Sequence, residues 1–223
     1  MSRIKVLSLA VLAVFALTAV AASSAFAAKE GKWVNSKGTK VEGKIKVASI
    51  GNQVLETKAG VKVTCTSASG EGAATSTTEA KVSGVTFKGC KKSTGGTCKS
   101  GTVAEEIVIG ELTEKVVTNA AKTKDQVITT IVPAVKFECA ETKVEVAAGG
   151  KFATTSVKEE GKLAKTSTLA AACKAGSPGV QQEEEAFVAA GSHLMTTIGK
   201  GAAEESCQSG EAVATPAEEA EFL

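Results

Sequence analysis

Three stretches decide the fold: VKVTC at residues 61–65, VTFKGC at 85–90 and VKFEC at 135–139. Each is a short run in which apolar and polar residues alternate, and each ends on a cysteine. A period of two places Val61, Val63 and Cys65 on one face of a strand, with lysine and threonine on the other. The pattern therefore predicts half-buried β-strands whose cysteines point into a core.

The same pattern recurs along the chain at intervals of roughly 8 to 12 residues, with turn sequences between the runs. It predicts an all-β fold, a two-layer antiparallel β-sandwich of about ten strands, with a closed β-barrel as the alternative. Lys58-Ala59-Gly60 and Gly149-Gly150 are interpreted as hairpin turns. Residues 66–79, rich in serine, threonine, alanine and glycine, are expected to form a long loop with at most a weak edge strand. Trp33 is expected to pin the first strand to the core.

The N-terminus has the three parts of a secretory signal peptide. Arg3 and Lys5 precede an apolar run from Val6 to about Val20, and Ala25-Phe26-Ala27 supplies a small-residue cleavage site. A transmembrane anchor is the competing interpretation, but it requires roughly 20 apolar residues. We expect residues 1–27 to form a signal peptide helix that is removed, residues 28–223 to form a single domain, and the protein to be secreted or held in the cell envelope.

Six cysteines in an exported chain indicate disulfides. Zinc is disfavoured because no cysteine pair has C-x-x-C spacing, and no metal or cofactor is predicted. Cys65 and Cys139 each end a row of inward-facing apolar side chains. Their common direction predicts that these two cysteines pair across the core. A local bridge across the turn between Cys90 and Cys98 leaves Cys173 with Cys207.

Charge and composition disfavour nucleic acid as a partner. Loss of Arg3 and Lys5 leaves 24 lysines against 24 acids, so the mature chain carries no arginine and no net charge. Nucleic-acid readers use arginine forks and stacking aromatic side chains, and tyrosine is absent here. No further apolar stretch is long enough to span a membrane once the signal is removed. The partner is expected to be an envelope or extracellular ligand.

Candidate catalytic residues are few. A Ser-His-Asp site would need His193 and Asp125, the one histidine and the one aspartate, and no G-x-S-x-G motif accompanies them. Glu183-Glu184-Glu185 is the densest acidic cluster, but neighbouring strand residues point to opposite faces and do not form a glycosidase pair. No catalytic residue is assigned, and a non-enzymatic binding or structural module is favoured. A secreted hydrolase with a site near His193 is the alternative.

The cysteine layout resembles that of exported, cysteine-containing, β-rich proteins of high-GC soil bacteria. The matching residues are Val63-Thr64-Cys65, Phe87-Lys88-Gly89-Cys90, Thr97-Cys98 and Phe137-Glu138-Cys139, within roughly residues 29 to 160. The resemblance implies an exported β protein and supplies no activity. Cys173 and Cys207 fall outside the shared pattern.

Overall fold

A computed structural model describes residues 29–118, 125–154, 164–182 and 193–223. The expected signal peptide and Glu183-Glu184-Glu185 lie outside these residues. The described strands are β1 (Lys29–Glu30), β2 (Trp33–Asn35), β3 (Ile45–Thr57), β4 (Lys62–Cys65), β5 (Ser67–Ala74), β6 (Glu79–Lys88), β7 (Lys91–Lys92), β8 (Cys98–Lys99), β9 (Glu106–Thr118), β10 (Asp125–Ile131), β11 (Val135–Cys139), β12 (Thr142–Val146), β13 (Lys151–Ala153), β14 (Ser167–Ala171), β15 (Leu194–Ile198), β16 (Glu204–Pro216) and β17 (Ala220–Phe222).

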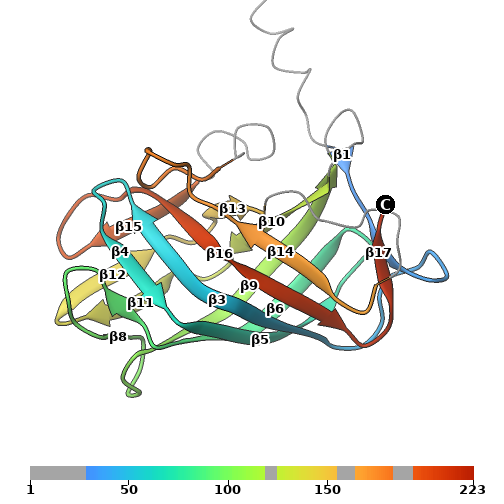
Figure 1. Cartoon of the computed structure of the whole chain (residues 1–223), viewed down its shortest axis with the longest axis horizontal. Coiled ribbons are helices and arrows are strands. Elements are labelled where there is room, and N and C mark those ends of the chain that lie inside the picture. The colour runs from blue at the N-terminus through green and yellow to red at the C-terminus, as the bar shows by residue number, and fades with distance from the viewer. Residues whose placement is uncertain (1–28, 119–124, 155–163, 183–192) are drawn as a thin grey trace, which may run out of the picture.

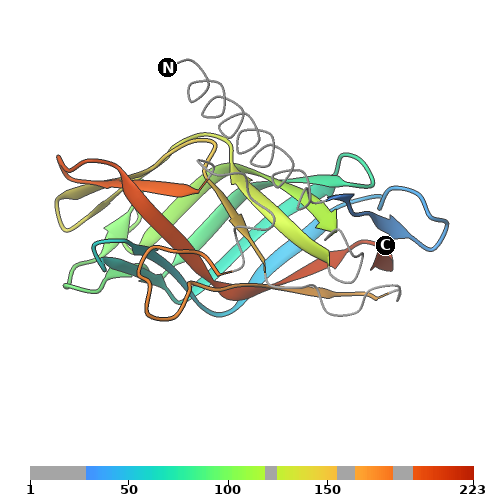
Figure 2. The ribbon, with the colours of Figure 1, turned by 90° about the horizontal axis from the view of Figure 1, so that it is seen from above.

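The all-β prediction is confirmed. Fifteen strands form one antiparallel sheet whose main path runs β13-β10-β9-β6-β5-β3-β16-β15-β12-β11-β8. The sheet curls until β14 and β16 lie opposite β9 and β10, as the two perpendicular views show (Figure 1, Figure 2). The result is a sandwich or half-barrel with one interior. Across the residues that the structure describes, no helix has the length and apolar character needed to cross a membrane.

Strand pairing also forms a closed circuit at one end of the molecule. From β3 the ladders pass through β4 to β7, and a bridge between Lys91 and Thr97 joins β7 to β8. From β8 they return through β11, β12, β15 and β16 to β3. A parallel bridge between Lys151 and His193 attaches the β13 edge beside β15. The sheet thereby wraps around its own apolar face.

The described residues form two main cores and a small third cluster of Val117, Ile128 and Ala153. The larger contains Val82, Leu112, Phe137, Leu194 and the four cysteines from Cys65 to Cys139. The smaller surrounds Trp33, which is only 8% exposed and stacks on Phe222 with ring centroids 5.8 Å apart. The predicted core role of Trp33 is confirmed, because β2 pairs with β17 and brings the two rings together.

The expectation of a loop over residues 66–79 is wrong. Ser67–Ala74 is strand β5, which pairs with both β3 and β6 and lies inside the sheet. Its small residues have a packing reason: a Cβ at Gly72 would lie 2.5 Å from the carbonyl oxygen of Lys81, and one at Gly70 would lie 3.0 Å from Val85. Glycine here permits close approach of neighbouring backbone rather than marking a loop.

One predicted hairpin is confirmed and the other is wrong. Gly60, with φ of 79°, lies in the turn between β3 and β4, which pair directly. The strands on either side of Gly149-Gly150 separate instead: β12 pairs with β11 and β15, whereas β13 pairs with β10. The N–H of Gly149 donates to the carbonyl oxygen of Ile131, so this turn crosses to a different part of the sheet.

All six cysteines form disulfides, but two of the three predicted pairs are wrong. Cys65 pairs with Cys90 and Cys98 with Cys139, whereas the Cys173–Cys207 pair is confirmed. Registers explain the result. The pairing registers of β4 with β7, of β7 with β8 and of β8 with β11 place four cysteines opposite one another. They form a single row across the strands, in the order Cys65, Cys90, Cys98 and Cys139. Had Cys90 bonded Cys98, Cys65 and Cys139 would lie three strand spacings apart, about 14 Å, and could not meet.

Candidate ligand cavity

A cavity of about 160 Å³ lies inside the curled sheet. Strands from both layers contribute residues to its walls. Figure 2 shows how the sheet folds over so that these layers face each other. The walls are mainly apolar, formed by Val47, Leu55, Val63, Val82, Val85, Phe87, Ile107, Ile109, Leu112, Ile131, Val135, Phe137, Val146, Phe152, Leu169 and Leu194. Protein interiors seldom leave more than a water-sized void. This cavity is therefore the leading candidate for a binding site.

Among the described residues that line this cavity, Glu114 carries the only ionisable group. It lies on β9 between the buried residues Leu112 and Val116 and shares their inward face. It forms no hydrogen bond or ion pair within the described part of the chain, and burial raises the pKa of its carboxyl group to about 7. The side chain of Glu114 is partly exposed. Because Glu114 also lines a second cavity, we attribute this exposed surface to the cavities rather than to the outside of the protein.

Two threonines line the same cavity as Glu114. Thr129 on β10 is its direct cross-strand partner, and Thr154 follows β13; both side chains are buried and line the cavity. The Thr154 hydroxyl accepts a hydrogen bond of 3.0 Å from the N–H of Val127. The Thr129 hydroxyl makes no hydrogen bond to the described residues. Glu114 and Thr129 therefore form a polar end in a mainly apolar cavity.

Glutamines form a second polar group on the wall, and these side chains already bond to one another and to the backbone. The Gln53 amide donates to the carbonyl oxygen of Glu211 at 2.9 Å, and the Gln208 amide donates to Gln53 Oε1 at 3.5 Å. They lie where the β3/β16 register shifts between Ser209 and Glu211. These glutamine side chains therefore satisfy polar groups at the register shift of the sheet.

The second cavity, of about 30 Å³, adjoins the smaller core. Trp33, Glu79 and Glu114 are among its lining residues. The Trp33 indole N–H is buried and has no hydrogen-bond partner among the described residues. Glu114 thus lies between two interior spaces. Of the residues that the structure describes, Glu79 is the only other charged one that lines either space.

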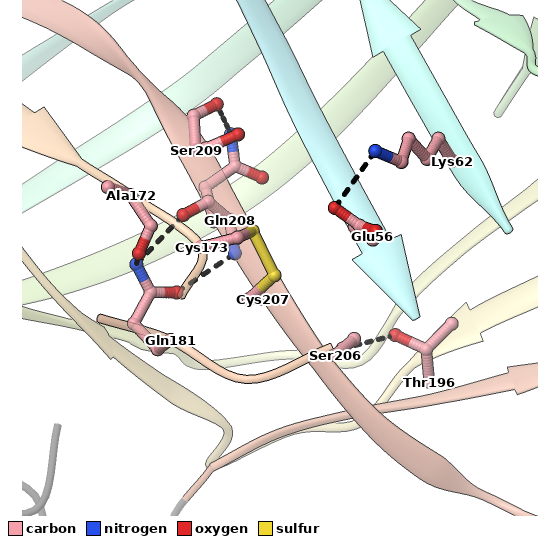
Figure 3. Close-up of a disulfide and its surroundings, with 10 residues drawn as sticks. All are labelled: Glu56, Lys62, Ala172, Cys173, Gln181, Thr196, Ser206, Cys207, Gln208 and Ser209. Carbon is pink, nitrogen blue, oxygen red and sulfur yellow. Dashed lines mark hydrogen bonds and ion pairs between the residues drawn. A yellow bond between two sulfur atoms is a disulfide. The ribbon is translucent and has the colours of Figure 1, made fainter. Parts of the chain in front are cut away.

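Gln181 closes a gap in the sheet beside the cavity. Along β16, β14 ends its pairing at Gly210 and β15 begins at Ser206. Between them the Gln181 side chain takes the place of a strand: its amide donates to the carbonyl oxygens of Ala172 and Gln208, and its oxygen accepts from the Gln208 N–H, all within 2.9 Å (Figure 3).

The Cys173–Cys207 disulfide fixes the same segment to β16 (Figure 3). Glu56 lies near these sulfur atoms and pairs with Lys62 at 3.2 Å. Both sulfurs are committed to the disulfide and offer no thiolate to a metal. This group is therefore a structural connection rather than a metal site.

His193 and Asp125 are not brought together. His193 is half-buried beside β15, bridges to Lys151 and does not line the cavity. Lys151 is opposite Thr130, whereas Asp125 begins β10 five residues earlier. Five residues of strand span about 17 Å, so a triad of these two residues with a serine cannot form.

Comparisons with protein-family models, with curated proteins and with solved structures find no match to this chain. The molecule itself defines the class: an all-β protein whose three disulfides indicate an oxidising environment and whose interior holds an apolar cavity with one carboxyl group.

Proposed function

We propose that this protein is an exported, non-enzymatic binding protein that takes a small apolar molecule into its interior. The cavity is the observation that supports the proposal. Its volume of about 160 Å³ is close to that of an engineered protein cavity of roughly 150 Å³ that binds benzene. Ligand sites in proteins are typically concave and apolar with few polar groups, as this one is.

The energetic cost of the cavity supports the same proposal. An unfilled cavity in a core costs about 24 cal/mol per Å³, so 160 Å³ corresponds to about 4 kcal/mol. This is a large fraction of the usual stability of a domain, about 5–15 kcal/mol. Larger side chains at small wall positions such as Ala171 or Ala212 would remove that cost. A ligand that fills the cavity gives a reason for keeping these positions small.

The binding test uses two single-ring probes, ethylbenzene and benzylamine, with thermal unfolding and calorimetric titration of the disulfide-bonded protein. We expect at least one probe to raise the melting temperature and to bind in a saturable manner. Ala212→Leu places a larger side chain on the cavity wall and should abolish this binding. Thr215→Leu, at an exposed position on the same strand, is the matched control and should leave it intact. Failure of both probes, or equal binding by the two variants, would refute a binding cavity.

Export is the second part of the proposal. The disulfides are compatible with an extracellular or envelope location, and the N-terminal sequence supplies a signal peptide pattern. Mass spectrometry of the protein from its native host should find a mature chain that begins at or near Ala28, recovered from the medium or the envelope. Accumulated protein that retains residues 1–27 would contradict export with cleavage.

A further inference from the structure

We infer that the cavity selects ligands in which an apolar body carries a protonated amine, with Glu114 as the counter-charge. This inference rests on the proposed binding function and names the ligand class. The observation behind it is that the carboxyl group of Glu114 lies in the interior without a described partner of opposite charge. A carboxyl group in a protein core is ordinarily paired with a cation or hydrogen-bonded. Glu114 has neither within the part of the chain that the structure describes.

Within the described ranges, no strand next to Glu114 supplies a cation. On β6 the residue opposite Glu114 is Ala80, and on β10 it is Thr129. The opposite layer contributes uncharged residues such as Leu169 on β14. Glu79, in the smaller cavity, is the other charged residue near this space and has the same sign. We therefore assign the positive charge that would balance an ionised Glu114 to a bound molecule.

The arrangement of the walls limits the shape of that molecule. Beyond Glu114 and Thr129 most of the wall is apolar, and the side chains of Gln53 and Gln208 are already hydrogen-bonded. One end of a ligand therefore meets acceptor oxygens, and the rest meets mainly hydrocarbon. Directly opposed residues on antiparallel strands have Cβ atoms about 5 Å apart, so one ammonium group can reach both side chains. A volume of about 160 Å³ holds one ring with a short substituent. The expected ligand is a small primary amine on a single ring or a branched hydrocarbon.

Benzylamine and ethylbenzene form a suitable probe pair, because they have the same shape and differ by an amino group in place of a methyl group. Calorimetric titration at about pH 8 should give an affinity of the wild-type protein for benzylamine about tenfold or more above that for ethylbenzene. Glu114→Gln keeps the shape of the side chain and removes its charge. It should lower benzylamine affinity about tenfold or more while ethylbenzene affinity is retained or increased.

Glu111→Gln is the matched control. It removes the same charge from the same strand, but Glu111 faces solvent and pairs with Lys81 at 3.4 Å. This variant should keep the full preference for the amine. A preference that both variants lose equally would assign the effect to the overall charge of the protein and overturn the inference.

The pH dependence gives an independent measurement. Benzylamine stays protonated between about pH 5 and about pH 8, whereas Glu114, with a pKa of about 7, ionises within this range. Benzylamine affinity should therefore rise with pH and level off above about pH 8, and ethylbenzene affinity should not rise. In Glu114→Gln the rise should be absent.

The outcomes separate the two proposals. Ethylbenzene binding with equal or weaker benzylamine binding would overturn the amine inference and leave the binding function in place. Binding of neither probe would refute both. A benzylamine preference that persists in Glu114→Gln would show that another part of the molecule recognises the amine.

Discussion

Glu114 should make the stability of this protein depend on pH in a way that one substitution removes. Burial raises the pKa of Glu114 from 4.5 to about 7. Between these values the folded state holds a proton that the unfolded chain has released, so the free energy of unfolding falls as pH rises. The contribution is fully present below about pH 4.5 and is lost as pH rises through about 7. A difference of about 2.5 pKa units corresponds to about 3 kcal/mol.

Glu114→Gln measures this contribution directly. At pH 4 the protonated carboxyl and the amide are alike, so wild type and variant should unfold with nearly equal free energies. At pH 8 the variant should be more stable by up to about 3 kcal/mol. Urea unfolding from pH 4 to pH 8, with disulfides intact and no ligand present, gives the difference at each pH. Effects of other groups cancel because both proteins share them.

Glu111→Gln serves as the control for the same strand, because it removes a carboxyl group that does not line the cavity and that pairs with Lys81. A constant difference between Glu114→Gln and wild type from pH 4 to pH 8 would refute the reasoning. So would a wild type more stable than Glu114→Gln at pH 8, since that would mean that the ionised carboxylate has a favourable partner.

Three further predictions concern the framework. Gln181→Ala removes three hydrogen bonds that fill the gap along β16 and should lower the free energy of unfolding by about 2 to 4 kcal/mol in urea titrations; a loss below about 0.5 kcal/mol would contradict this role. Cys65→Ala and Cys90→Ala break the same disulfide, which joins residues 25 positions apart, so each should lower the free energy of unfolding by a similar amount, up to about 3.5 kcal/mol. Non-reducing peptide mapping should recover the Cys65–Cys90 pair, and a clear difference in stability between the two variants would count against it. Gly176→Ala and Gly179→Ala both place alanine at positive φ, but only the second puts a Cβ against backbone, at the Lys58 nitrogen. Gly179→Ala should therefore lower the melting temperature clearly more than Gly176→Ala, and equal shifts would rule out this contact.

Strands with large alternating side chains could be predicted from the sequence, and strand β5 could not. The runs that end at Cys65 and Cys139 are strands with their cysteines inward, as the alternation predicts. In β5 the inward positions are small because neighbouring backbone lies close to them. Hydrophobic periodicity does not detect a strand of that kind.

Disulfide pairing could not be derived because it depends on registers between short strands. Inward direction was predicted for Cys65 and Cys139, and both are buried. The two-residue strands β7 and β8 then place Cys90 beside Cys65 and Cys98 beside Cys139. Two-residue strands have too little sequence to specify these neighbours, so proximity along the chain suggested the wrong local bridge.

Glu114 was missed because the inward pattern of β9 changes phase at Gly110. Alternation continued from Ile107 and Ile109 would turn Glu111 inward and Glu114 outward. In the structure Leu112 and Glu114 join Ile107 and Ile109 on the cavity wall. The signal that could have found Glu114 is the local pattern Leu112-x-Glu114-x-Val116, a carboxyl group within an apolar row.

The pairing of β3 with β16 has a consequence for the order of assembly. These strands form one of the longest ladders in the sheet, yet the residues that they join, such as Thr57 and Ser206, are separated by roughly 150 to 170 positions along the chain. A chain that emerges from its N-terminus cannot complete this ladder until β16 has followed, and β2 must wait similarly for β17. Contacts at such separation make folding slow. Until β16 has been made, β3 can pair only with β4 and β5, so one of its edges stays open and the curled sheet cannot close around its apolar face.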